Sequence, residues 1–62
     1  MDRAERRKEI GKDIRCVRVR LGLTQEQLAK KTGTTAAMIS QYESGKTAPP
    51  TDKYQEIMAL NS

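Results

Sequence analysis

The sequence predicts a small all-α fold of four short helices, or five, in a single domain. Three observations favour this fold class: apolar residues recur at steps of three and four, Thr residues stand where helices need caps, and glycines follow the apolar segments. With 62 residues, of which 35% are hydrophobic, the chain can bury a compact core. It is too small to enclose a roomy pocket for a substrate, so no enzyme activity is expected.

The first helix is expected over residues 2 to 21. Its apolar residues recur at steps of four, three and four and form one stripe: Ile10, Ile14, Val17 and Leu21. Gly11 weakens this helix by about 1 kcal/mol relative to alanine, and Gly22 ends it. Residues 1 to 9 are nearly all charged and have nothing obvious to bury, so we expect them to fray. They are assigned as an N-terminal extension, and residues 10 to 62 as the domain.

The second helix is expected to begin at a capping box, because Thr24 is followed three residues later by Gln27. It runs to about Thr32, after which Gly33 supplies a left-handed turn. Ala29 is small, which indicates that another helix crosses closely at that position.

The third helix is expected from Ala36 to about Glu43, capped by Thr34 or Thr35. Ile39 and Tyr42 are its inward positions, and they pin it across the second helix. The opposite face then projects outward and includes Ala36, Ala37, Ser40 and Gln41.

Residues 44 to 46 stop the third helix, and residues 48 to 50 form an extended link because of the two prolines. Thr51 is expected to cap a fourth helix. The apolar side of that helix consists of Tyr54, Ile57 and Met58, with Leu60 near its end. The two Tyr residues fall on apolar faces and are interpreted as packing residues.

Charge favours a polyanionic partner. The chain carries 12 Lys and Arg against 8 Asp and Glu, a net charge of +4. Residues 1 to 20 contain the whole excess, and cations placed on phosphates release condensed counterions. The alternative is a solvated helix face. The same two interpretations apply to residues 1 to 9, which are either a solvated face or an arm that adds phosphate contacts.

The chain has one cysteine, Cys16, and no histidine. A Cys/His metal site is therefore not expected, no cofactor is expected, and a reducing, cytoplasmic setting is favoured. Cys16 is interpreted as an inert small residue beside the apolar stripe. No membrane span or secretory signal is visible in the sequence.

The run LGLTQEQLAKKTGTTAAMISQYESGKTAPP resembles the Cro and cI repressor family of helix-turn-helix domains, also known from xenobiotic response element regulators. The resemblance covers about residues 10 to 60, and its most specific parts are LGLTQEQLA, GTT and ISQYESGK. It implies a lambda-repressor-like domain that binds double-stranded DNA, with the second helix of the motif in the major groove.

Matched position by position, the resemblance implies that Gln25 donates to a DNA phosphate and that Thr35 and Lys46 also hold the backbone. Arg18 is expected to pair with Glu43 and so to be structural. The positions that face base edges are Ala36, Ala37, Ser40 and Gln41.

The chemistry of that face indicates its base preference. Gln41 can donate to and accept from adenine, Ser40 can serve several bases, and the two alanines suit thymine methyl groups. The face has no Arg or Lys for guanine, so an A·T-leaning half-site is predicted.

The expected function is transcriptional regulation, with repression favoured, by a homodimer on operator DNA. The alternative is an antitoxin-like or accessory protein whose main partner is another protein.

Overall fold

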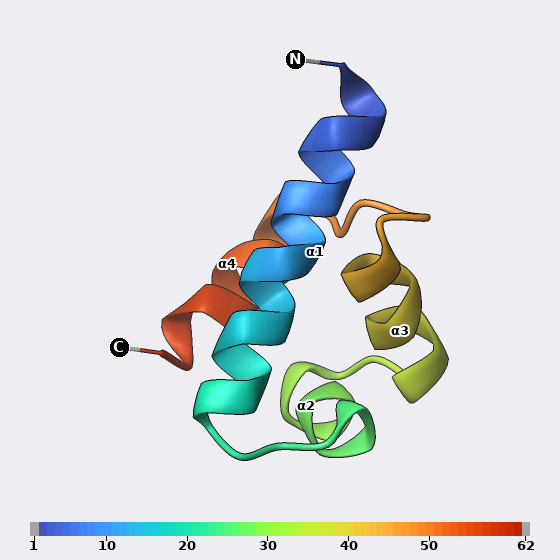
Figure 1. The fold of residues 1–62 in the computed structure, drawn as a ribbon. Coiled ribbons are helices and arrows are strands. Elements are labelled where there is room, and N and C mark those ends of the chain that lie inside the picture. The colour runs from blue at the N-terminus through green and yellow to red at the C-terminus, as the bar shows by residue number, and fades with distance from the viewer. Residues whose placement is uncertain (1, 62) are drawn as a thin grey trace.

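A computed structural model of the protein describes residues 2–61. In this range the chain forms α1 (Arg3–Arg20), α2 (Gln25–Thr32), α3 (Ala36–Ser44) and α4 (Thr51–Ala59). No strand and no fifth helix occur between residues 2 and 61, so the all-α class is confirmed with four helices. Helices α3 and α4 both pack against α1, and α2 packs against α3 and α4. Figure 1 shows α3 and α4 on different sides of α1, whose first turns project beyond the other helices.

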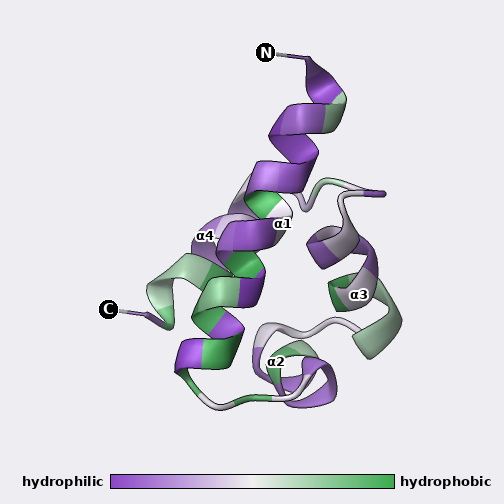
Figure 2. Cartoon of the chain, in the orientation of Figure 1, coloured by the Kyte–Doolittle hydropathy of each residue, from purple (hydrophilic) through white to green (hydrophobic). Residues whose placement is uncertain are grey.

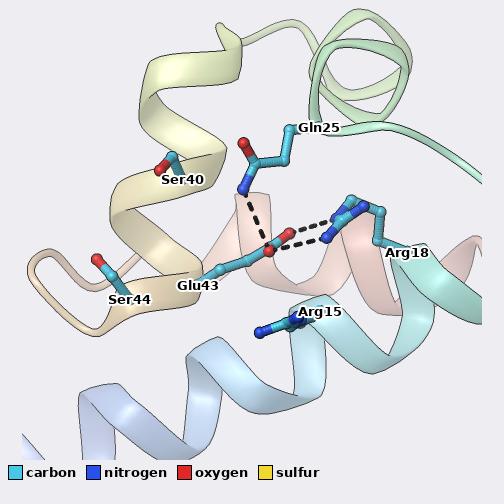
Figure 3. Close-up of a pocket in the computed structure, with 6 residues that line it drawn as sticks. All are labelled: Arg15, Arg18, Gln25, Ser40, Glu43 and Ser44. Carbon is cyan, nitrogen blue, oxygen red and sulfur yellow. Dashed lines mark hydrogen bonds and ion pairs between the residues drawn. The ribbon is translucent and has the colours of Figure 1, made fainter.

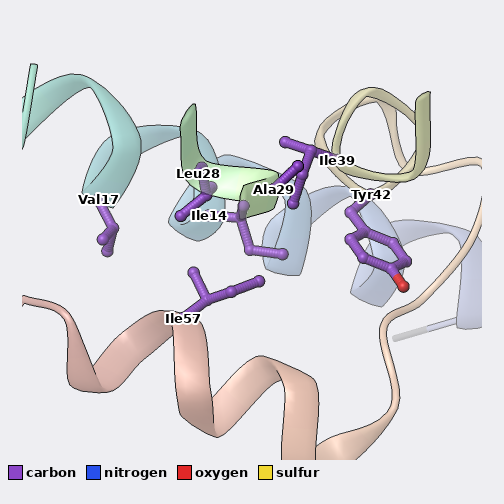
Figure 4. Close-up of a cluster of buried hydrophobic side chains, with 7 residues drawn as sticks. All are labelled: Ile14, Val17, Leu28, Ala29, Ile39, Tyr42 and Ile57. Atoms are coloured by element: carbon purple, nitrogen blue, oxygen red, sulfur yellow. The ribbon is translucent and has the colours of Figure 1, made fainter. Parts of the chain in front are cut away.

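The core joins all four helices through one aliphatic side chain from each. These side chains are fully buried: Ile14, Leu28, Ile39 and Ile57. Val17, Ala29 and Tyr42 complete the buried cluster, which Figure 4 shows between the helices. The burial of Ile39 and Tyr42 confirms that these residues face inward. Burying one such aliphatic side chain contributes about 1.5 to 3 kcal/mol, so a short chain depends on every member of the cluster.

The predicted apolar stripe of α1 is correct except at its end. Ile14 and Val17 are buried, and Ile10 is half-buried against the core. Leu21, however, is 41% exposed, so its assignment to the stripe is wrong. It is the C-cap residue of α1, and the chain turns away at Gly22 before another helical turn can carry it over the core. Cys16 is also exposed.

The first turns of α1 are helical from Arg3 onward. The Asp2 side chain caps the helix by accepting a hydrogen bond from the Glu5 N–H at 2.8 Å. Further along, Arg7 is half-buried and its Nε donates to the Gly45 carbonyl at 3.2 Å. The hydrophilic segment at the start of α1, visible in Figure 2, is therefore connected to the turn that follows α3.

Gly11 lies where α1 crosses α3. A Cβ at this position would be 2.4 Å from the carbonyl oxygen of Tyr42 and 2.7 Å from that of Glu43. These distances are far below van der Waals contact, so any larger residue would push the two helices apart. The helix weakness that Gly11 introduces is thus compensated by a backbone-to-backbone approach that only glycine permits.

Local capping signals define the start of α2 and the turn after it. The capping box is confirmed, since the Thr24 N–H donates to Gln27 Oε1 at 2.9 Å and the Gln27 N–H donates to Thr24 Oγ1 at 3.1 Å. Gly33 has the expected left-handed conformation, with φ of 68°. Of the two Thr residues considered for α3, Thr35 is the cap: its Oγ1 accepts from the Met38 N–H at 3.2 Å.

The start of α4 differs from the prediction. Thr51 is the first helical residue and not the cap, and no side chain within residues 2–61 caps the helix. The reason is that the Pro50 carbonyl accepts from the Tyr54 N–H at 2.9 Å, which closes the first helical turn one residue earlier. Pro50 therefore occupies the N-cap position, and its ring has no oxygen that could accept from an N–H of the first turn.

Helix α4 is connected to both neighbouring helices by polar contacts. Lys53 Nζ donates to the Thr32 carbonyl at the end of α2. The Tyr54 hydroxyl donates to Asp13 Oδ2 on α1 at 3.4 Å. Burial, together with the charge of Asp13 and this hydrogen bond, raises the pKa of Tyr54 above its ordinary value. None of the helices within residues 2–61 has the length and apolar character needed to cross a membrane.

Candidate nucleic-acid interface

Helix α3 has two sharply different faces. Its inward residues, Ile39 and Tyr42, are 0% and 4% exposed. The four residues predicted to read bases lie on its other side. Ala37, Ser40 and Gln41 are exposed, and Ala36 is half-buried. The helix therefore presents small and polar side chains outward while its apolar residues attach it to the core.

The carboxamide of Gln41 is oriented by a neighbour that the sequence analysis did not identify. Thr47 donates from its Oγ1 to Gln41 Oε1 at 3.1 Å. An amide oxygen has two lone pairs, so Oε1 can still accept a second hydrogen bond while Nε2 donates. This donor and acceptor pair is the one that adenine requires in the major groove.

The expected pair of Arg18 and Glu43 is present and ties α1 to α3. Arg18 Nε lies 2.7 Å from Glu43 Oε2, and its Nη2 donates to Oε1 at 3.2 Å. Arg18 Nη1 also donates to the Leu23 carbonyl at 3.0 Å. The two side chains are only 17% and 7% exposed, so this bidentate contact is largely shielded from water.

Gln25 joins the same cluster from α2. It is the first residue of that helix and half-buried, and its Nε2 donates to Glu43 Oε1 at 3.3 Å. Figure 3 shows Gln25 and Arg18 converging on Glu43 from different helices. The second hydrogen of the Gln25 amide has no acceptor among residues 2–61, and the N-terminal end of α2 adds partial positive charge beside it.

A hollow of about 290 Å³ opens beside this cluster, between α1, α2 and α3. Its lining residues are Arg15, Arg18, Gln25, Ser40, Glu43 and Ser44. Arg15 is exposed and has no ion-pair partner among residues 2–61. Arg15 is not among the contacts predicted from the sequence, although its position three residues before Arg18 and four after Gly11 places it on the face of α1 that meets α3.

The two remaining predicted backbone contacts lie at opposite ends of α3. Thr35 is exposed and caps the start of the helix. Lys46 is exposed just beyond its end, and the Lys46 N–H donates to the Gln41 carbonyl at 3.1 Å. Gly45, with φ of 82°, turns the chain so that Lys46 follows α3 directly. The predicted base-facing residues are thus bracketed by the predicted phosphate contacts.

Comparison with known proteins identifies this arrangement. The family model described as helix-turn-helix matches residues 14–60, which include all of α2, α3 and α4 and part of α1. No solved structure matches the chain. Domains of this family are DNA-binding modules of transcription regulators. The chain therefore belongs to the helix-turn-helix family of the Cro and cI type.

Proposed function

We propose that this protein is a transcriptional repressor that recognises a specific sequence of double-stranded DNA with α3. The observation that supports this most directly is the division of α3 into a buried side, Ile39 and Tyr42, and an exposed side that includes Ser40 and Gln41. The major groove of B-DNA is about 12 Å wide and admits one α-helix. A helix anchored by one side and small on the other can enter it without losing core contacts.

The exposed side of α3 determines the predicted base preference. Gln41 pairs with adenine through Nε2 and Oε1, and Thr47 limits the rotation of that amide by its hydrogen bond to Oε1. Ala36 and Ala37 contact thymine methyl groups, and Ser40 adds a hydrogen bond to a neighbouring base. The half-site is therefore A·T-leaning, with DNA shape and deformability contributing the rest of the discrimination.

Gln25, Thr35 and Lys46 position the domain on the phosphates. Contacts of this kind fix the register of α3 but carry no sequence information themselves. The longest dimension of the molecule is 30 Å, so one copy covers about one half-site. Two copies bind as a homodimer on half-sites about 34 Å apart, one helical turn of DNA. As a regulator of transcription, the protein acts in the cytoplasm, where it meets its operator.

Selection of duplexes from a random pool, followed by affinity measurements on the selected operator, tests this proposal. Gln41→Ala is expected to cost about 1 to 3 kcal/mol at one base position and to relax selection there. Lys46→Ala is expected to weaken binding to all sequences. It is also expected to make the negative slope of log affinity against log salt shallower by about one. Gln55→Ala on α4 and Lys30→Ala on α2 are matched controls, because both are exposed and lie outside the proposed contacts.

Wild-type affinity in both Gln41→Ala and Lys46→Ala would show that these residues do not contact DNA. A protein that selects no duplex at all would contradict the function itself. In that case, copurification with a protein partner would favour the antitoxin-like or accessory role.

A further inference from the structure

We propose that α1 carries a basic track, Lys8, Lys12 and Arg15, that binds the DNA backbone beside the recognition helix. This inference rests on the proposed function and extends the contact surface to a helix outside the helix-turn-helix pair. It adds three phosphate-binding residues to those that the motif implies. The DNA phosphate is the ligand, and the contacts are independent of base sequence.

The spacing of the three residues places them on one face of α1. They are separated by four and then three positions, the spacing at which side chains are neighbours on a helix surface. All three are exposed. No acidic residue between 2 and 61 forms an ion pair with any of them. Their charges are therefore available to an external anion.

One end of the track lies at the hollow beside the Arg18–Glu43 pair. Arg15 lines this hollow with Gln25, the predicted phosphate contact of α2, and with Ser40 and Ser44 of α3. Figure 3 shows Arg15 reaching from α1 into this region. Glu43, the acidic group of the hollow, is engaged by Arg18 and Gln25 and forms no ion pair with Arg15. The other polar groups that line the hollow are two serine hydroxyls and the Gln25 amide.

The other end of the track lies at the turn that carries Lys46. A Cβ on Gly45 would be 3.2 Å from the Lys8 Cα and 3.3 Å from the Lys8 nitrogen, which places Lys8 directly against this turn. The hydrogen bond from Arg7 Nε to the Gly45 carbonyl holds the two segments together. The basic track thus connects the two predicted phosphate contacts, Gln25 at one end and Lys46 at the other.

Acidic neighbours do not cancel the charge of this face. Asp13 is turned toward α4, where it accepts from the Tyr54 hydroxyl. Glu5 and Glu9, which stand three residues before Lys8 and Lys12, are the acidic residues of α1 that flank the track, and neither forms an ion pair between residues 2 and 61. Three cations against two neighbouring carboxylates leave the face positive by one charge.

The length of the track suits a DNA strand. The seven residue-to-residue steps of helix from Lys8 to Arg15 span about 10 Å. Successive phosphates of one strand advance about 3.4 Å along the axis of the duplex. Three long side chains spread over this length can therefore each reach a different phosphate of one strand.

The test is the salt dependence of binding to a random-sequence duplex, measured for the full chain. The double variant Lys12→Gln/Arg15→Gln is expected to make the negative slope of log affinity against log salt shallower by about 1.8, since each phosphate contact contributes about 0.9 to its magnitude. The conservative double variant Lys12→Arg/Arg15→Lys is expected to keep the wild-type slope.

The matched control is Arg3→Gln/Arg6→Gln, which removes the same charge from the same helix. Both residues are exposed and lie at least about 120° around α1 from every member of the track. The slope of this control is expected to change by less than about 0.5. Thermal unfolding of each variant verifies that the fold is intact, as expected for substitutions at exposed positions.

Two results would overturn the inference: an unchanged slope in Lys12→Gln/Arg15→Gln, or equal losses in this variant and in the control. The first result would mean that the track does not contact DNA. The second would mean that the salt dependence of binding follows the net charge of the protein and not the position of the charges. Either result leaves the proposed function standing if the wild type selects an operator and Gln41→Ala weakens its binding. A wild-type protein that binds no duplex would contradict both proposals.

Discussion

At the scale of single residues, Glu43 is the junction of three helices beside the proposed interface. Its carboxylate accepts from Arg18 of α1 and from Gln25 of α2, while its own backbone belongs to α3. One side chain thereby sets the relative positions of three helices. It also orients the amide of Gln25, which is proposed to hold a phosphate. A charged group at only 7% exposure depends on such partners, because an unpaired buried charge is costly.

Glu43→Gln is therefore expected to destabilise the fold by about 3 kcal/mol, the lower end of the range for removing one partner of a buried ion pair, because Arg18 keeps some exposure. Glu56→Gln is the matched control. Glu56 pairs with Lys53 on the surface at 3.2 Å and is 48% exposed, so its loss is expected to cost less than about 1 kcal/mol. Chemical denaturation of both variants measures the difference. Equal costs would mean that the Arg18 contact adds nothing to stability.

At the scale of helices, the crossing of α1 and α3 depends on Gly11. Helix propensity by itself predicts that alanine at this position is better by about 1 kcal/mol. The crossing reverses that expectation, because the added Cβ would meet the carbonyl groups of Tyr42 and Glu43. These atoms are backbone and cannot rotate away as a side chain can. Helix α3 would have to shift, and the exposed face that carries Gln41 would shift with it.

Gly11→Ala is expected to lower the free energy of unfolding by about 1 to 3 kcal/mol, the usual cost of overpacking. It is also expected to weaken operator binding, although Gly11 is buried behind α3 and does not face the groove. Denaturant midpoints and duplex affinity measure the two effects. A gain in stability would instead show that α1 and α3 are not in backbone contact.

The helix caps can be predicted from the local sequence, whereas the crossing of α1 and α3 cannot. The capping box of Thr24 and Gln27 and the left-handed Gly33 follow from local residues, and the sequence predicts both correctly. For α3 the sequence leaves two candidates, Thr34 and Thr35, and the structure shows that Thr35 is the cap. Thr51 is the exception. Its neighbour Pro50 provides the first carbonyl of the helix, so the Thr side chain is not used as a cap.

At the scale of the whole molecule, a 62-residue chain is stabilised by about 3 to 9 kcal/mol in total. Four fully buried aliphatic side chains, one from each helix, form the centre of its core. Helix α4 contributes Ile57 and contacts α1 and α2, which keeps those two helices together behind the interface. The interface therefore depends on a helix that is not itself predicted to contact DNA.

Ile57→Ala is expected to cost about 2 to 5 kcal/mol, the range for truncating a buried aliphatic side chain. That cost is a large part of the total free energy of unfolding. The midpoint of thermal unfolding should therefore shift to a much lower temperature, and operator binding should weaken because less of the protein is folded. Val19→Ala provides the control, because Val19 is 61% exposed and its truncation is expected to cost less than about 0.5 kcal/mol. Similar stability in the two variants would mean that α4 does not close the core.

The sequence by itself determined the four helices, the capping box of α2 and the inward direction of Ile39 and Tyr42. These features depend on neighbours within about one helical turn, whose spacing can be read directly from the chain. Only the tertiary structure decided why residue 11 is glycine, why Leu21 is left in solvent and that Arg15 lines the hollow beside Glu43. Gly11 and Tyr42 are 31 positions apart, and no local pattern records how closely two backbones approach when distant segments pack.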